Sequence, residues 1–224
     1  GVPRSTTGAG PRVIELRGPR ASGFLQEACT ADVMTLRRGS WERSFVADAN
    51  GDVLADVLIA RPESDGAEDG EGEPRYWVLV GQDDAERLRD WFEALSDGYV
   101  VFDRQDLLAK VQGPVVVRDL GAATDLAARE QLVRQAMAQV AKDAGLAVAA
   151  RTPLAAAADR FPQHVGRAKP YFVGQHLVAT AEGPEKPAFV AQPYVGEPRR
   201  SCLYEEHLKL TAARNMIPFA GWTM

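Results

Sequence analysis

The clearest pattern of hydrophobic and polar positions consists of two apolar runs on either side of a short polar turn. The turn, at 48–52, contains an Asn-Gly pair, which supplies the positive φ angles that a tight β-hairpin needs. In the second run, 53–60, strand alternation places Asp56 on one face together with Leu54 and Leu58. Both faces of this strand are otherwise apolar. The pattern therefore predicts a hairpin whose second strand carries one carboxylate among apolar side chains.

Shorter patterns predict the other elements. Apolar runs that end at Gly, Pro or polar clusters predict strands over 13–17, 75–80 and 99–102. The helical spacing of apolar residues predicts helices that begin near residues 21, 83, 124, 154 and 201. Asp83 and Glu86 have the spacing of a capping box, and Thr124 is expected to cap the next helix. Because strand–helix units are interleaved with a hairpin, the chain is predicted to be α+β, with a mostly antiparallel sheet that carries helices on one side.

Changes of composition divide the chain into three segments. Residues 1–120 contain the hairpin and the strand–helix units, and form the first predicted domain. Residues 121–198 begin with an alanine-rich helix, which Gly145 is expected to end, and continue as irregular strands punctuated by Pro and Gly. Residues 199–224 contain a last helix and an apolar segment with large side chains. This C-terminal part is predicted to be irregular and to depend on neighbouring protein for cover.

The composition is that of an ordinary soluble globular protein, with 46% hydrophobic and 25% charged residues among 224. The net charge of -5 gives no indication of a nucleic-acid partner. No apolar run approaches the roughly 20 residues that span a bilayer, and the first residues lack the hydrophobic stretch of a signal peptide. We therefore expect a cytoplasmic protein without a membrane partner. Cys29 and Cys202 have no zinc or disulfide spacing, so both are expected to be free thiols, and no metal is expected.

Asp56 is the residue best placed to carry chemistry. A carboxylate on an apolar strand loses water, which raises the pKa of such a group unless hydrogen-bond donors compensate, and perturbed groups of this kind mark functional sites. The alternative is a buried aspartate bonded to nearby backbone N–H groups, and the sequence leaves both roles open. His164, His176 and His207 lack the spacing of a nucleophile or metal site, and surface or capping roles are expected for them.

Four stretches of the sequence resemble one known family. They are VIELRGPRASGFLQEACTADVMTL at 13–36, ANGDVLADVLIAR at 49–61, YWVLVGQDDAERLRDWF at 76–92 and LLAKVQGP at 107–114. Each is similar to a segment of the glycine-cleavage T-protein (aminomethyltransferase) family, and together they cover about half of the chain in the family's order and spacing. The resemblance implies a fold like the folate-binding domain of that family for residues 1–120.

The resemblance also implies an activity. The family transfers a one-carbon unit from an aminomethyl group on the lipoyl arm of a partner protein to tetrahydrofolate, and it releases ammonia. Its essential aspartate matches Asp56, whose carboxylate would lie beside the pterin-side nitrogens of the folate and favour the charge that develops there. By the same match, Leu54, Arg43, Val80 and Gly81 are expected to contact the folate. Tetrahydrofolate is thus the implied cofactor, and a lipoyl carrier protein is the implied partner.

Several positions depart from the family's pattern. Ala55 replaces the first of the paired acids, Asp52 replaces the second glycine of the hairpin, Arg43 replaces a pocket tyrosine and Gly81 replaces an asparagine. The family's later glycine-rich segment, which holds the folate through a glutamate and an arginine, has no counterpart after 113–114. The alanine-rich helix stands in its place.

Two later segments resemble further parts of these proteins. KPYFVGQHLV at 169–178 is similar to a late element of the T-protein and to the K-G-C-Y-x-G-Q motif of related folate-binding proteins that assist iron–sulfur cluster assembly. Residues 201–224 resemble the amino terminus of a T-protein, which implies a tandem copy. The apolar segment around Phe219 and Trp222 is then expected to pack on such a copy or to mediate self-association.

Two functions of different class follow from the sequence. In the first, the chain binds reduced folate with Asp56 facing the pterin and takes part in aminomethyl transfer. In the second, it is a non-catalytic, degenerate folate-binding or interaction module attached to an active copy, as the substitutions at Arg43 and Gly81 indicate. A third function, in iron–sulfur assembly, is disfavoured because Tyr171 stands at the cysteine position of the motif.

Overall fold

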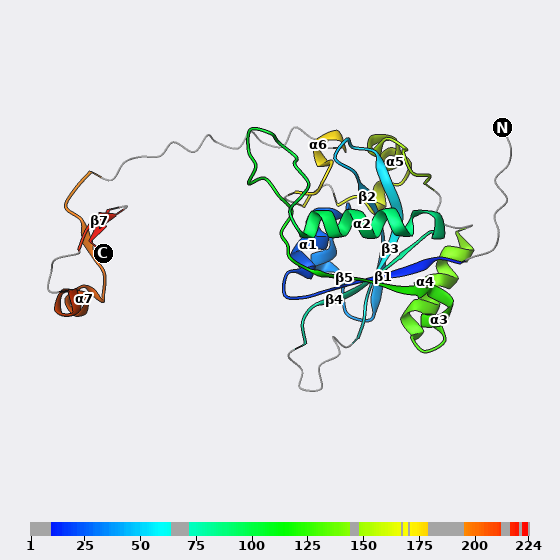
Figure 1. The fold of residues 1–224 in the computed structure, drawn as a ribbon, viewed down its shortest axis with the longest axis horizontal. Coiled ribbons are helices and arrows are strands. Elements are labelled where there is room, and N and C mark those ends of the chain that lie inside the picture. Colours follow the sequence, from blue (N-terminus) through cyan, green and yellow to red (C-terminus); the bar gives the residue numbers. More distant parts are fainter. Residues whose placement is uncertain are drawn as a thin grey trace. The chain divides into compact units, whose positions relative to one another are not determined.

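The structure is a computed structural model with two compact units, Gly1–Thr180 and Ala181–Met224, each of which is described by itself (Figure 1). The residues that it describes are 10–63, 72–143, 148–166, 168–169, 171–178, 195–211, 216–219 and 221–223. The first unit contains the sheet and the helices around the candidate site, and the second contains the C-terminal segment.

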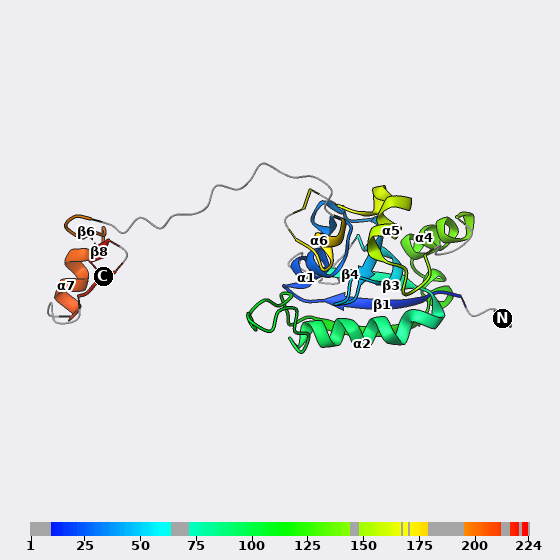
Figure 2. The ribbon, with the colours of Figure 1, turned by 90° about the horizontal axis from the view of Figure 1, so that it is seen from above.

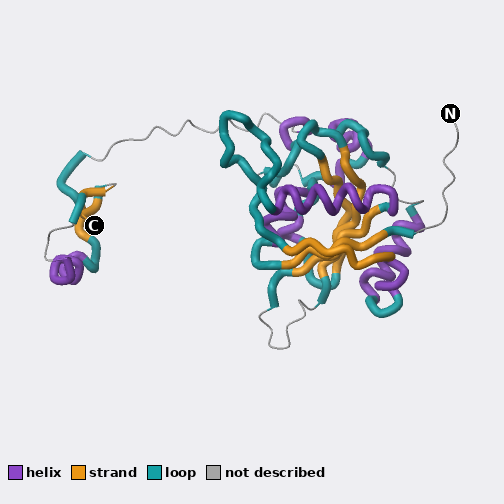
Figure 3. The backbone as a smooth tube through the Cα atoms, viewed as in Figure 1, coloured by secondary structure: helices purple, strands orange, loops and turns teal. Residues whose placement is uncertain are grey.

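A five-stranded antiparallel sheet forms the centre of the first unit. Its strands are β1 (Arg12–Arg17), β2 (Ser40–Ala47), β3 (Val53–Arg61), β4 (Arg75–Val80) and β5 (Val116–Ala122). Their order across the sheet is β2-β3-β4-β1-β5, and every neighbouring pair is antiparallel. Figure 3 shows these strands gathered at the centre of the unit, with helices around them. The predicted α+β class with a mostly antiparallel sheet is therefore confirmed.

Within the described part of this unit, six α-helices and three 3-10 turns accompany the sheet. The helices are α1 (Ala21–Ala28), α2 (Ala85–Ser96), α3 (Ala123–Ala127), α4 (Gln131–Lys142), α5 (Leu154–Arg160) and α6 (Gln175–Val178). The turns are η1 (Val33–Thr35), η2 (Gln82–Asp84) and η3 (Pro162–His164). Among the described residues of the chain, no helix combines the length and the apolar character that crossing a bilayer requires.

Helices cover both faces of the sheet rather than one. Ile14, Tyr76 and Val78 lie in one apolar core together with side chains of α1 and α2. Trp77 and Leu79 lie in a second core together with side chains of α3 and α4. Figure 2 shows α2 on one side of β1 and α4 on the other. The predicted single layer of helices is corrected in this respect, because alternating residues of the central strands are apolar on both sides and each side has to be covered.

The predicted hairpin is confirmed. β2 and β3 pair along their length in antiparallel register. Gly51 has a φ of 85° in the turn between them. The side chain of Asp48 accepts hydrogen bonds from the backbone N–H groups of Asn50 (2.8 Å) and Asp52 (3.1 Å), which closes the turn. The turn therefore fixes the register in which β3 presents Asp56 to β2.

Three local predictions are wrong. Residues 99–102 are not a strand, because the remaining edge of β1 pairs with β5 instead. The capping box at Asp83 is not formed, since η2 precedes α2 and the N-cap residue Asp84 makes no side-chain cap bond. Thr124 lies inside α3, whose N-cap residue is Ala122.

The predicted alanine-rich helix is divided into two. α3 ends at Ala127 and α4 begins at Gln131. Arg134 donates a hydrogen bond from Nη2 to the carbonyl oxygen of Ala127 at 2.9 Å, which closes the break between the two helices. The predicted end of this helix at Gly145 lies outside the described residues. The helix that was predicted from residue 154 is confirmed as α5.

The second unit contains, in its described part, a small sheet and one helix. Strands β6 (Arg199–Arg200), β7 (Pro218–Phe219) and β8 (Trp222–Thr223) have the order β6-β8-β7, and α7 comprises Tyr204–Thr211. None of the described residues of α7 is buried. Phe219 is 65% exposed and Trp222 is 40% exposed, so this unit by itself leaves large apolar side chains in water.

Candidate ligand-binding site

The pairing of β2 with β3 brings two charged side chains together. Arg43 of β2 lies opposite Leu58 of β3, and Asp56 is two residues away on the same strand as Leu58. Arg43 donates two hydrogen bonds to the carboxylate of Asp56, from Nε to Oδ1 (3.0 Å) and from Nη2 to Oδ2 (2.8 Å). The strand register therefore produces a bidentate ion pair, the geometry in which a guanidinium recognises a carboxylate best.

The carboxylate of Asp56 is fully engaged by protein groups. Besides Arg43, the backbone N–H of Val148 donates a hydrogen bond to its Oδ2 at 3.1 Å. Asp56 is 2% exposed, and it is not among the residues that line the two hollows described below. Of the two roles that the sequence leaves open, the geometry matches the buried aspartate that is held by hydrogen-bond donors.

A second carboxylate holds Arg43 from another side. Oδ2 of Asp143, which follows α4, lies 3.8 Å from Nη1 of Arg43, and the ring centroid of Phe161 lies 5.7 Å from its Cζ. The hydrogen bonds to Asp56 raise the pKa of Arg43, and the charges of Asp56 and Asp143 add to this rise against the opposing effect of burial. Arg43 is therefore a fixed cation whose position is set by two carboxylates.

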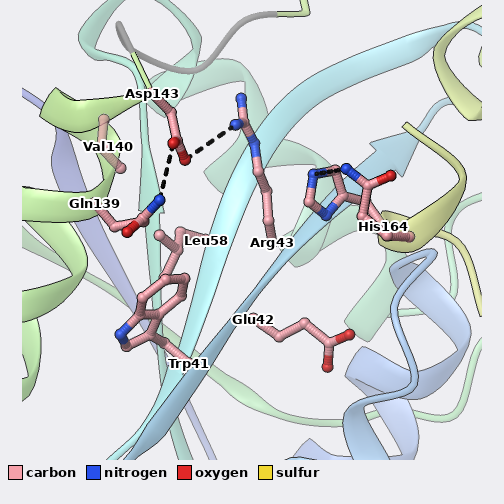
Figure 4. Close-up of a pocket in the computed structure, with 9 residues that line it drawn as sticks. Trp41, Glu42, Arg43, Leu58, Gln139, Val140, Asp143 and His164 are labelled. Atoms are coloured by element: carbon pink, nitrogen blue, oxygen red, sulfur yellow. Dashed lines mark hydrogen bonds and ion pairs between the residues drawn. The ribbon is translucent and has the colours of Figure 1, made fainter. Parts of the chain in front are cut away.

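Arg43 lies in the wall of a hollow of about 260 Å³ (Figure 4). The lining residues come from β2, β3, the end of α4 and η3, and are Trp41, Glu42, Arg43, Leu58, Gln139, Val140, Asp143, Gln163 and His164. A second hollow of about 400 Å³ shares Arg43, Asp143, Gln163 and His164 and adds Arg160 and Phe161. The two hollows therefore meet at Arg43.

The wall that α4 contributes combines apolar and polar groups. Val140 faces the hollow beside Leu58 and Trp41, and these three side chains supply its apolar surface. Gln139 donates a hydrogen bond from Nε2 to Oδ1 of Asp143 at 2.8 Å. Because Asp143 in turn approaches Arg43, the polar groups on this side are held in place by one another.

His164 lines both hollows from η3. Burial, and then the positive charge of Arg43, lower the pKa of His164 from its usual 6.5, so the imidazole is neutral at pH 7. Its Nε2 lies 3.3 Å from Nε2 of Gln163, and its ring packs against the rings of Phe45 (6.0 Å between centroids) and Phe161 (5.7 Å). A neutral imidazole has one donor and one acceptor nitrogen, so His164 offers a ligand a hydrogen bond without a charge.

Glu42 contributes to the wall, but its carboxylate lies away from the guanidinium of Arg43 (Figure 4). It pairs in register with Ile59, whose side chain belongs to the core that contains α1 and α2. Burial, and then the charge of Asp32, raise the pKa of Glu42, while the charge of Lys169 lowers it. This carboxylate therefore belongs to a different charge cluster from the Arg43 pair.

Among the five residues predicted to contact folate, only Arg43 lines these two hollows. Leu54 and Val80 are 9% and 0% exposed and pack in the core that contains α1 and α2. Gly81 lies just before η2 and is half-buried. The structure thus brings Arg43 and Asp56 into direct contact and leaves the other three residues away from the hollows.

Eight of the nine residues that line the first hollow, all except Arg43, have no counterpart in the sequence prediction of the site. Trp41, Gln139, Asp143 and His164 come from a strand, a helix and a 3-10 turn that are distant in the sequence. The spacing of Gln139 and Asp143, four residues apart, is a weak signal that these two side chains share a face of α4. That signal does not distinguish a ligand-binding face from an ordinary solvated one.

Among the described residues, no group of three or more His, Cys, Asp or Glu side chains could hold a metal ion. Cys29 is buried, and its burial raises the pKa of the thiol to about 12, which makes it a poor nucleophile and ligand. Cys202 is exposed, in the second unit.

Comparisons with known proteins find similarity among solved structures. No protein-family model matches the chain, and no curated protein matches it significantly. A crystal structure of the glycine cleavage system aminomethyltransferase T from Bartonella henselae is similar to it with a TM-score of 0.34 and 18% sequence identity, over 49% of this chain and 25% of that chain. The similarity is weak, and the chain spans about a quarter of that protein's length.

Proposed function

We propose that this chain is a non-catalytic binding module of the T-protein type, and that the hollow beside Arg43 takes a planar, polar molecule of the reduced-folate class. One observation carries the proposal: Asp56, which the resemblance matches to the family's essential acid, accepts hydrogen bonds from Arg43 and from the N–H of Val148. In this proposal, Asp56 keeps the position of the acid but has a structural role.

A carboxylate that assists transfer must reach the reacting atom. Proton transfer and charge stabilisation need a heavy-atom distance of about 2.6–3.2 Å to the substrate, directly or through one water. Both oxygens of Asp56 already accept hydrogen bonds from the protein, and the guanidinium of Arg43 stands between this acid and the hollows. Aminomethyl transfer by Asp56 would require Arg43 to leave a buried ion pair, which is energetically costly.

The hollow has the surface expected of a small-molecule site. Such sites combine apolar and aromatic walls with a few placed polar groups. Here Trp41 and Val140 supply the apolar surface, while Gln163 and the neutral imidazole of His164 supply donors and acceptors. A reduced pterin presents a planar ring with amide and amine edges, which matches both kinds of wall. The choice of folate over other planar molecules rests on the sequence resemblance.

The binding part of the proposal is tested by calorimetry with 5-formyltetrahydrofolate, a stable reduced folate. We expect saturable binding at pH 7 that Trp41→Ala weakens by about tenfold or more, since the substitution removes an aromatic wall worth at least ~1.4 kcal/mol. Trp91→Ala is the matched control, because Trp91 is also half-buried but lies on α2, behind the other face of the sheet. Absence of saturable binding, or an equal loss in both variants, would exclude folate from this hollow.

The non-catalytic part is tested by turnover. The chain is incubated with tetrahydrofolate and an aminomethylated lipoyl carrier protein, and released ammonia is measured. We expect ammonia at the background rate, for the wild type and for Asp56→Asn alike. Ammonia release above the background rate that depends on the wild-type chain would contradict the proposal and favour the enzyme.

A further inference from the structure

A buried lysine near the site holds three backbone carbonyl groups. The ammonium nitrogen of Lys169 donates hydrogen bonds to the carbonyl oxygens of Gln26 (2.5 Å), Cys29 (2.6 Å) and Ala31 (2.7 Å). Lys169 is 5% exposed. Two of the three acceptors follow the last residue of α1, Ala28, so the cation lies at the negative end of that helix.

This arrangement uses every donor of an ammonium group. A protonated lysine has three N–H donors and no acceptor, which matches three carbonyl oxygens. A neutral amine has two N–H donors and a lone pair, so one buried carbonyl would lose its donor and face the lone pair instead. The geometry of the cluster therefore requires the proton on Lys169.

The surroundings of Lys169 place its titration close to neutral pH. Burial lowers the pKa of Lys169 to about 8. Three carboxylates oppose this fall: Asp32 at the N-cap of η1, Glu42 of β2 and Glu27 of α1. The ring centroid of Phe172 lies 5.1 Å from the ammonium, which adds a further contact that favours the cation.

A chain of three hydrogen bonds connects Lys169 to the turn that carries His164. The backbone N–H of Lys169 donates to the carbonyl of Gly166 (3.1 Å), and the N–H of Gly166 donates to the carbonyl of Thr30 (2.7 Å). The hydroxyl of Thr30 donates to the carbonyl of His164 (2.7 Å). Thr30 lies between Cys29 and Ala31, two of the three residues whose carbonyl groups bind Lys169. The hydrogen bonds of Lys169, here called the Lys169 clamp, therefore hold the same segment that binds His164.

The same threonine fixes this structure to β2. The N–H of Thr30 donates to the carbonyl of Phe45 (2.9 Å), and the N–H of Phe45 donates to the hydroxyl of Thr30 (2.9 Å). That hydroxyl, whose proton is donated to His164, accepts a further hydrogen bond from the hydroxyl of Ser44 at 3.2 Å. Phe45 is two residues from Arg43 on the same strand, so the clamp sets the distance between His164 and the Arg43 side of the hollow.

We propose that Lys169 is a positioning residue of the hollow: its ammonium form holds 29–31 so that Thr30 keeps His164 against β2, and loss of the proton releases His164 and weakens ligand binding. The inference rests on the proposed function, because it names how binding in that same hollow depends on a proton. Lys169 itself does not line the hollow.

The first test measures the dissociation constant of 5-formyltetrahydrofolate at pH 7 and pH 9 by calorimetry. With a pKa of about 8, roughly a tenth of the protein keeps the proton at pH 9, so binding is expected to weaken by up to about tenfold. The Cys29 thiol, whose pKa is about 12, does not titrate in this range, and His164 is already neutral throughout it.

Two variants fix the charge in opposite senses. Lys169→Arg keeps a cation at all relevant pH values, so its affinity should be the same at pH 7 and pH 9. Lys169→Met is neutral, so its affinity should be low and equal at both. If Lys169→Arg weakens from pH 7 to pH 9 as much as the wild type does, another group causes the effect and the proposal is wrong.

A third measurement needs no ligand and no substitution at Lys169. In wild-type protein labelled with ¹³C at histidine and lysine, the ring signals of His164, assigned with His164→Gln, should shift between pH 7 and pH 9.5 with the same midpoint as the Lys169 side-chain signal. A stationary His164 signal while Lys169 titrates overturns the positioning role. A shift without any ligand binding at pH 7 would instead mean that the clamp exists and that the proposed function has failed.

Discussion

Arg43 and Asp56 lie on neighbouring antiparallel strands, two positions of the register apart, and are joined by two hydrogen bonds of 3.0 and 2.8 Å. In this diagonal pair, Arg43, which the sequence resemblance matches to a folate contact, is the partner of Asp56, which the same resemblance matches to a catalytic acid. The side chains are 10% and 1% exposed, so the pair is a buried one and its loss has a large energetic consequence.

Asp56→Asn should destabilise the first unit strongly. The substitution leaves a nearly buried guanidinium without its charged partner, which typically costs about 3–5 kcal/mol. Urea unfolding of the wild type and the variant measures the free energy of unfolding. The control is Asp90→Asn, which removes an exposed ion pair with Arg89 and should cost less than about 1 kcal/mol. Equal small losses for both variants would show that the buried pair is not needed for the fold.

Acid should destabilise the protein partly through His164. Because the pKa of His164 in the folded chain is lowered from 6.5, the unfolded chain binds more protons between the two values. The stability from the neutral imidazole is fully present above pH 6.5 and is lost as the pH falls through the folded-state value. His164→Gln should therefore flatten the decline of the melting temperature between pH 7 and pH 5. A decline of unchanged slope would contradict this assignment.

Glu42→Gln should stabilise the protein at pH 7. Burial raises the pKa of Glu42 from 4.5, so the folded chain binds more protons than the unfolded chain just above pH 4.5, and stability falls as the pH rises through the raised value. Glutamine removes the free-energy cost of burying the charged carboxylate. The variant should therefore be more stable than the wild type at pH 7, and this difference should vanish below pH 4.5. Glu86→Gln, at an exposed position of α2, serves as the control and should show no such pH-dependent gain.

The two thiols should differ sharply in reactivity. Cys202 is exposed, whereas Cys29 is buried with a pKa of about 12, so little thiolate is present and a reagent cannot reach it. Ellman's reagent at pH 8 should titrate one thiol rapidly in the native protein and the second only in denaturant. Cys202→Ser should abolish the rapid phase. A rapid phase that survives in Cys202→Ser would show that Cys29 is accessible.

Local chemistry explains which elements could be predicted. The Asn-Gly turn and the alternating apolar residues of 53–60 specify the hairpin without tertiary information, and the structure has it at that place. Residues 99–102 have the composition of a strand, but the edge of β1 accepts one neighbour, and β5 occupies it. A pattern of residue types cannot show which of two segments wins that competition.

The site was harder to predict for a similar reason. The burial of Asp56 followed from its apolar strand, but its partner did not, because the diagonal contact with Arg43 depends on the exact pairing of β2 with β3. Asp143 and His164 reach Arg43 only after α4 and η3 pack over the sheet. No local sequence pattern determines those distances. The resemblance therefore pointed to Asp56, whereas its surroundings became known only from the structure.

Because Arg43 belongs to the strand next to Asp56, the cation that neutralises this carboxylate cannot diffuse away. A free amine would have to compete with Arg43 for Asp56, and Arg43 is held beside Asp56 at an effective concentration far above that of the amine. Molecules that enter from the solvent therefore encounter the guanidinium and not the acid behind it. A positively charged amine that enters the hollow therefore cannot make the direct contact with Asp56 that a bare carboxylate would offer.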